Sequence, residues 1–224
     1  KNFDIKQKRY FLFKNEMNLE KKNIEVFKLN KEKRIILLEM LNKIHNIFIK
    51  GKIIYYIMDE TLYGYHKNKK INKYCEYISI NVIEETFDIE FVTKMLKYVD
   101  FKIIRNFGFY KIISNKIDLI NKYSICINIF LVEKVKNKIT YYNQINGLYS
   151  NIFQLNKKIY DFDDIFPLQK VRFENMYICI PSEPEKILIQ IYGEKYQKKL
   201  TFNNIYSPIS YLYTKLTGIR NVSL

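Results

Sequence analysis

The alternation of apolar and polar positions predicts a chain of short strands and amphipathic helices. Between residues 31 and 50, apolar side chains recur every three or four residues, which predicts a helix with one buried face. We expect Gly51 to end this helix in the left-handed conformation that glycine adopts without strain. The same spacing predicts another helix at 88–99.

The other apolar runs are short and rich in β-branched and aromatic residues, as strands are. They lie at 52–58, 78–84, 101–107, 109–114, 124–135 and 168–181, the last read as two strands joined at Glu174 and Asn175, and two further short strands are expected within 1–30. A short helix is expected to begin near Thr61, and another to begin with Ser182 as its N-cap and to end at Gly193.

These elements predict an α+β fold in which a mixed sheet packs against helices. We interpret 1–224 as a single domain, with N-terminal strands or an extension at 1–30 and a C-terminal extension at 197–224. The hydrophobic fraction of 48% fits a folded core. No apolar run approaches the ~18 to 20 residues that a membrane span needs, and the first residues lack the pattern of a signal peptide. The chain does not begin with Met, so an upstream anchor stays open.

The net charge of +15 favours anionic partners, and a basic RNA-associated protein or structural subunit of a complex is one alternative function. Only five of the 38 basic residues are Arg, and the lysines are scattered without an aromatic RNA-binding signature. Codons of an AT-rich genome would produce the same abundance of Lys, Asn, Ile and Tyr. The charge therefore indicates a basic surface and does not single out RNA.

The three cysteines, Cys75, Cys126 and Cys179, are odd in number and far apart, which does not fit a disulfide framework. We interpret them as buried or partly buried thiols, which favours a reducing compartment. An alternative brings Cys75 and Cys126 together around a soft metal, although two cysteines without a third ligand make a poor zinc site. His45 is interpreted as packing beside the apolar face of its helix.

Two segments carry a family resemblance. Around the first helix after residue 58, Thr61, Leu62 and Gly64 fit the pattern G-T-x-x-G-x-x-R, and Lys67 replaces its arginine. The second segment fits F-P-L-x-K-V-x-F followed by P-x-x-P-E-x-x-L-x-x-x-Y-G. Its matching residues are Phe166, Pro167, Leu168, Lys170, Val171, Phe173, Pro181, Pro184, Glu185, Leu188, Tyr192 and Gly193. Over residues 31–196 the chain resembles the phosphocholine transferases of the LicD type and their animal relatives, fukutin and fukutin-related protein.

The resemblance implies a nucleotidyltransferase-like fold and transfer of a phospho-substituent from a CDP-linked donor to a glycan. The family's D-x-D pair falls on Tyr77 and Ser79, and its third acid falls on Asn128. All three are neutral, whereas Mg²⁺ prefers carboxylate oxygens. Glu60 also replaces the turn glycine. We therefore expect a catalytically inactive protein with a binding or assembly role, without a metal or other cofactor.

Other interpretations stay open. In an active phosphotransferase, Glu76 would join Asp59 or Glu60 around a shifted Mg²⁺, although Glu76 should face away from Ser79 unless a bulge intervenes. Thr61, Gly64, Lys67, Lys69 and Lys170 are the candidates for phosphate or nucleotide binding. Expected partners are a protein or a glycan, with weak binding of a nucleotide or sugar phosphate. Tyr55, Tyr56, Tyr63 and Tyr65 are interpreted as packing residues, with a sugar platform as the alternative.

Overall fold

The computed structural model describes residues 29, 31–72, 75, 77–106, 108–115, 125–141, 159–194 and 196. Apart from Leu29, the strands expected within 1–30 lie outside these residues, as does the extension at 197–224. The elements are α2 (Lys31–Lys50), β1 (Tyr55–Ile57), α3 (Asp59–Asn68), β2 (Tyr77–Ile83), the 3-10 helix η1 (Glu84–Thr86), α4 (Ile89–Lys97), β3 (Phe101–Asn106), β4 (Phe109–Ser114), β5 (Cys126–Val135), β6 (Lys138–Tyr141), β7 (Ile159–Asp161), α6 (Phe162–Ile165), β8 (Gln169–Phe173), β9 (Met176–Ile180) and α7 (Pro184–Tyr192).

The described strands form a mixed sheet in the order β1-β2-β5-β4-β3, together with a separate hairpin of β8 and β9. β2 and β5 are parallel, whereas the other pairs in this sheet are antiparallel. β5 is ten residues long, and its last residues pair with β6, which in turn pairs with β7. The predicted α+β fold, with a mixed sheet packed against helices, is confirmed.

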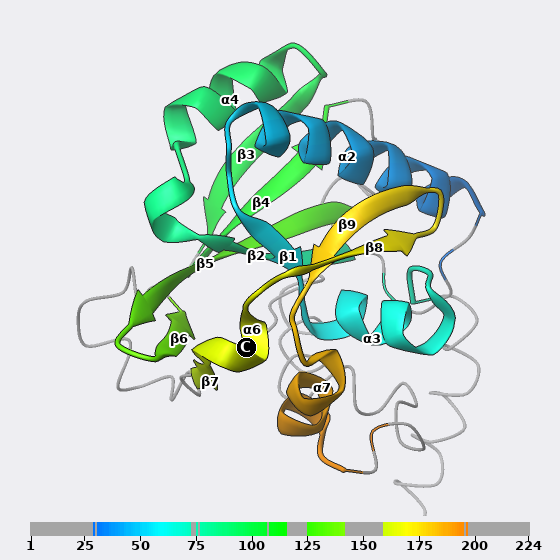
Figure 1. Cartoon of the computed structure of the whole chain (residues 1–224). Coiled ribbons are helices and arrows are strands. Elements are labelled where there is room, and N and C mark those ends of the chain that lie inside the picture. Colours follow the sequence, from blue (N-terminus) through cyan, green and yellow to red (C-terminus); the bar gives the residue numbers. More distant parts are fainter. Residues whose placement is uncertain are drawn as a thin grey trace, which may run out of the picture.

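Helices α2 and α4 lie together on one face of the sheet, and that face is apolar (Figure 1). Strand residues alternate between the two faces of a sheet. Ile78, Ile80 and Val82 of β2 are fully buried on the side of α2, next to Ile127 and Ile129 of β5. Each such fully buried side chain contributes about 1.5–3 kcal/mol to folding. The regular spacing of apolar residues in α2 is what allows one helix to cover this face.

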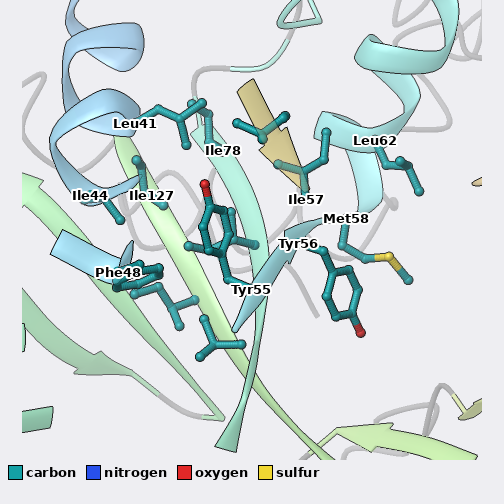
Figure 2. Packing of buried hydrophobic residues seen from close by; sticks show 14 of the residues in the cluster. Leu41, Ile44, Phe48, Tyr55, Tyr56, Ile57, Met58, Leu62, Ile78 and Ile127 are labelled. Carbon is teal, nitrogen blue, oxygen red and sulfur yellow. The ribbon is translucent and has the colours of Figure 1, made fainter. Parts of the chain in front are cut away.

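The first strand shows the alternation at two consecutive residues. Tyr55 points towards α2, where its ring packs edge-on against Phe48 with centroids 5.3 Å apart, whereas Tyr56 points to the opposite side (Figure 2). Helices α3, α6 and α7 lie towards that opposite side (Figure 1). The two faces therefore differ in chemistry, because the second one carries buried polar side chains.

Two helix ends differ from the sequence prediction. Gly51 does not adopt a left-handed conformation; the positive φ of 56° belongs to Lys52. A Cβ at Gly51 would lie 2.6 Å from Cε1 of Phe91, so a larger residue would have to displace this side chain of α4. Helix α7 ends at Gly193 as predicted, but it begins at Pro184 with Glu183 at the N-cap. The predicted cap, Ser182, instead donates its backbone N–H to the carbonyl of Ile165 at 3.0 Å.

Candidate functional site

The candidate site is built on the face of the sheet that α2 and α4 do not cover. Ser79 of β2 and Asn128 of β5 are directly paired across the parallel strands, and Tyr77 is paired with Cys126. Ser79 and Asn128 are 2% and 4% exposed, and Tyr77 is half-buried. Because the side-chain period of a strand is two, all four residues share one face. The three positions singled out from the sequence, Tyr77, Ser79 and Asn128, therefore lie together.

Two hydrogen bonds, one between backbone groups and one to a side chain, attach the start of α3 to β2 beside this pair. Met58 donates its N–H to the carbonyl of Ser79 at 3.1 Å, and Ser79 donates its N–H to Oγ1 of Thr61 at 2.8 Å. The Thr61 hydroxyl thus fixes the first turn of α3 against β2. Asp59 and Glu60 are half-buried in that turn, and Asp59 has a left-handed φ of 50°. The third residue of the proposed shifted metal site, Glu76, lies outside the described residues.

The glycine of the first motif has a packing reason. A Cβ at Gly64 would lie 2.5 Å from the carbonyl oxygen of Lys70 and 2.7 Å from the backbone N of Asn72. Those atoms are backbone and cannot rotate away. Glycine at this position allows the segment after α3 to fold back onto the helix.

The three candidate lysines lie in two different places, two at the end of α3 and one on β8. Lys67 and Lys69 are exposed at the end of α3, where the Nζ of Lys67 lies 3.3 Å from the hydroxyl of Tyr63 and the Nζ of Lys69 lies 3.9 Å from the centre of the Tyr65 ring. Lys170 is on β8, and its charge acts on His45 of α2. Since α2 covers the other face of the sheet, Lys170 is not brought together with Ser79.

Sequence reasoning missed a buried lysine in the same row. Lys111 of β4 is directly paired with Asn128 and is 4% exposed. The strand order therefore places Ser79, Asn128 and Lys111 side by side on β2, β5 and β4. One signal was available, because Lys111 is the only charged residue in the strand-like run 109–114.

Several tyrosines have buried hydroxyl groups near Asn81 and the start of α3. Tyr56 is directly paired with Asn81, and the Nδ2 of Asn81 donates to its hydroxyl at 3.3 Å. The hydroxyl of Tyr192 has no hydrogen-bond partner. The Oδ1 of Asn81 and the hydroxyls of Tyr141 and Tyr160 make no hydrogen bond of good geometry, although Asn81 is near enough to Tyr141, and Tyr141 to Tyr160, for each to lower the pKa of its neighbour. Burial raises the pKa of each of these hydroxyls, and the charge of Asp59 raises it further. We call this set (Tyr56, Asn81, Tyr141, Tyr160 and Tyr192) the tyrosine cluster.

Unpaired buried polar atoms destabilise a protein unless something else bonds to them. In the tyrosine cluster they come from four separate elements, β2, β6, β7 and α7, and the charge of Asp59 acts on all three hydroxyls. The arrangement suits a ligand that both donates and accepts hydrogen bonds. Tyr55, Tyr56, Tyr63 and Tyr65, which were interpreted from the sequence as packing residues with a sugar platform as the alternative, are all buried.

The cysteines take up different environments. Cys75 and Cys126 are buried, and Cys179 is half-buried. The thiol of Cys75 donates to the carbonyl of Tyr77 at 3.3 Å, and that of Cys126 donates to Oδ1 of Asn128 at 3.5 Å. Within the described part of the chain, no three His, Cys, Asp or Glu residues are grouped so that they could hold a metal ion.

The donor set fits a divalent metal poorly. Mg²⁺ takes oxygen ligands and normally one or two carboxylates, whereas the row of Ser79, Asn128 and Lys111 offers a hydroxyl, an amide and, beside them, a positive charge.

Among the helices that the structure describes, none combines the length and hydropathy needed to span a bilayer.

Comparison with known proteins gives distant relatives. No family model matches the chain. An uncharacterized protein of Rickettsia prowazekii (strain Madrid E) is 24% identical over 195 residues, or 87% of this chain, and one of Rickettsia typhi (strain ATCC VR-144 / Wilmington) is 25% identical over 205 residues, or 91%. The chain spans 66% and 59% of the length of these two relatives. Among solved structures, it is similar to the lincosamide antibiotic adenylyltransferase LnuA with lincomycin bound, at 14% identity and a TM-score of 0.44, over 78% of this chain and 99% of that one.

Proposed function

We propose that this chain is a nucleotidyltransferase-type protein related to the LicD transferases that binds a phosphate-bearing nucleotide or sugar and does not catalyse metal-dependent transfer. The observation that carries the proposal is the direct pairing of Ser79 with Asn128. In the family that the sequence resembles, this is where carboxylates hold Mg²⁺ against the donor phosphates. Here both side chains are neutral, and so is Tyr77.

The surrounding architecture supports retention of a ligand site. Thr61 fixes α3 against β2 beside Ser79, so the turn that would approach the donor is held in place without metal. The segment 164–196, which carries the longer sequence resemblance, forms the β8–β9 hairpin and α7. Tyr192 of α7 brings an unpaired hydroxyl towards Asp59 and Glu60. These polar groups favour a ligand with hydroxyl and amine groups.

Isothermal titration with CDP and CDP-choline in EDTA tests the binding, and the same titration in MgCl₂ tests the metal. We expect equal affinity in the two buffers and no release of phosphocholine to a glycan acceptor. Binding that requires Mg²⁺, followed by product formation, would overturn the proposal in favour of an active transferase. The Ser79→Asp, Asn128→Asp, Lys111→Met triple variant is the matched comparison, because two carboxylates without the neighbouring ammonium group should introduce a dependence on Mg²⁺.

A further inference from the structure

Lys111, the buried lysine next to Asn128, has no role in the function proposed above. Lys111 is 4% exposed, and lysine is rarely so buried without an anion beside it. The ion pairs seen in the described part of the chain join Arg34 to Glu174, Lys43 to Glu39, Lys138 to Asp161 and Lys186 to Asp164, and Lys111 takes part in none of them. Burying a charged ammonium group without an anion beside it is unfavourable, because the group loses its hydration. This position therefore favours an anionic ligand.

Pairing across three strands determines which groups such a ligand would meet. Ser79 is opposite Asn128, and Asn128 is opposite Lys111. Directly opposed residues have Cβ atoms about 4.5–5.5 Å apart and share one face of the sheet. A hydroxyl, an amide and an ammonium group therefore stand in one row. All three can donate hydrogen bonds, and the ammonium group has donors alone.

This row has the opposite polarity to a metal site. A divalent cation needs several oxygen acceptors and would be repelled by the lysine charge. A phosphate group needs donors and positive charge, and it bonds to lysine as to a point charge. We propose that Ser79, Asn128 and Lys111 bind a phosphate group directly, with the ammonium group of Lys111 supplying the positive charge that a metal supplies in a transferase.

The inference rests on the proposed function, because it concerns the same face, and it adds the ligand class and the residue that binds it. The carboxylates on this face lie at the Ser79 end of the row. Asp59 and Glu60 stand between Met58 and Thr61 in the chain, and both of those residues hydrogen-bond to the backbone of Ser79. Lys111 is at the far end of the row, because β5 separates β4 from β2. The phosphate is therefore expected closest to Lys111, and the rest of the ligand would extend past Ser79 towards the tyrosine cluster.

The test is titration of inorganic pyrophosphate into the protein in EDTA at physiological salt, for wild type and Lys111→Met. We expect Lys111→Met to weaken pyrophosphate binding at least about tenfold. Lys94→Met is the matched control, since Lys94 is an exposed lysine on α4, a helix of the opposite face. The pyrophosphate affinity of this control should stay within about twofold of wild type. It removes one positive charge, as Lys111→Met does, but leaves Ser79, Asn128 and Lys111 unchanged.

A second variant keeps the test informative if Lys111→Met folds poorly. In Asn128→Asp, a carboxylate faces the ammonium group and takes the place of the phosphate, so pyrophosphate affinity should fall by a similar factor while thermal stability is maintained. Wild-type affinity in a folded Lys111→Met variant would overturn the inference, and so would the absence of pyrophosphate binding by wild type. In both cases, CDP binding in EDTA would leave the proposed function standing. Pyrophosphate binding that requires Mg²⁺ would overturn both.

Discussion

Arg34 on α2 and Glu174 in the β8–β9 turn form an ion pair in which Nη2 lies 2.5 Å from Oε2. The other carboxylate oxygen of Glu174 accepts the backbone N–H of Ile71 at 2.9 Å. The backbone N–H of Glu174 donates to the carbonyl of Lys69 at 3.0 Å. One side chain, 7% exposed, therefore links the first described helix, the hairpin and the segment after α3.

We expect Glu174→Ala to lower the free energy of unfolding by about 2 kcal/mol, because it leaves a guanidinium and a backbone N–H without their partner. Urea denaturation measures this. Glu39→Ala is the control: its ion pair with Lys43 lies on the surface of α2 with Glu39 57% exposed, and its loss should change stability by less than about 0.5 kcal/mol. Equal effects of the two variants would contradict the linking role of Glu174.

Gly64→Ala should destabilise the protein by about 2 kcal/mol, although alanine favours helices by about 1 kcal/mol over glycine. The added methyl group would meet backbone atoms of Lys70 and Asn72. Thermal unfolding gives the comparison with Gly193→Ala, where no atom lies within 4 Å of the new Cβ and only the φ of 82° is unfavourable. A stabilised Gly64→Ala would show that the segment after α3 does not approach the helix.

Tyr192→Phe should raise the free energy of unfolding by about 1 kcal/mol, since it removes a buried hydroxyl without a partner. Chemical denaturation of the ligand-free protein measures the change. Tyr56→Phe serves as the contrast, because its hydroxyl accepts a hydrogen bond from Asn81 and its removal leaves that donor unpaired. If Tyr192→Phe is instead the less stable of the two, the Tyr192 hydroxyl has a bonding partner and the interpretation of the cluster is wrong.

The stability of the protein should decrease as the pH falls below about 6.5. Burial lowers the pKa of His45 from its ordinary value of 6.5, and the charge of Lys170 lowers it further. The groups near His45 are the hydroxyl of Tyr55, 2.6 Å from its Nδ1, and the β8–β9 hairpin, in which Lys170 is paired with Cys179. The unfolded chain therefore binds more protons than the folded one between the two pKa values. This stabilising contribution is complete above 6.5 and is lost as the pH falls through the folded pKa.

Urea midpoints at pH 7.5 and 5.0 should differ less in His45→Gln than in wild type. An NMR titration separates the two causes: Lys170→Met should raise the pKa of His45, and Lys94→Met on α4 should leave it unchanged. A His45 pKa at or above 6.5 in wild type would contradict the prediction.

The described fold was largely predictable because its elements have strong local periodicity. The stripe of apolar residues in α2 and the alternation in β2 each specify a face, and the register that follows places Ser79 next to Asn128. Helix ends were less predictable. Gly51 was predicted as a left-handed cap, yet it instead leaves room for the side chain of Phe91, which lies 40 positions further along the chain.

The sequence by itself determined the two faces of the sheet and the absence of carboxylates at Tyr77, Ser79 and Asn128, since both depend on residue type and on a period of two. The tertiary structure alone decided that Lys111 lies beside Asn128 and that Tyr141, Tyr160 and Tyr192 gather near Asp59. Those contacts arise from strand order and helix docking. They join segments far apart in the chain, and no local pattern of side chains specifies which strand becomes the neighbour of which.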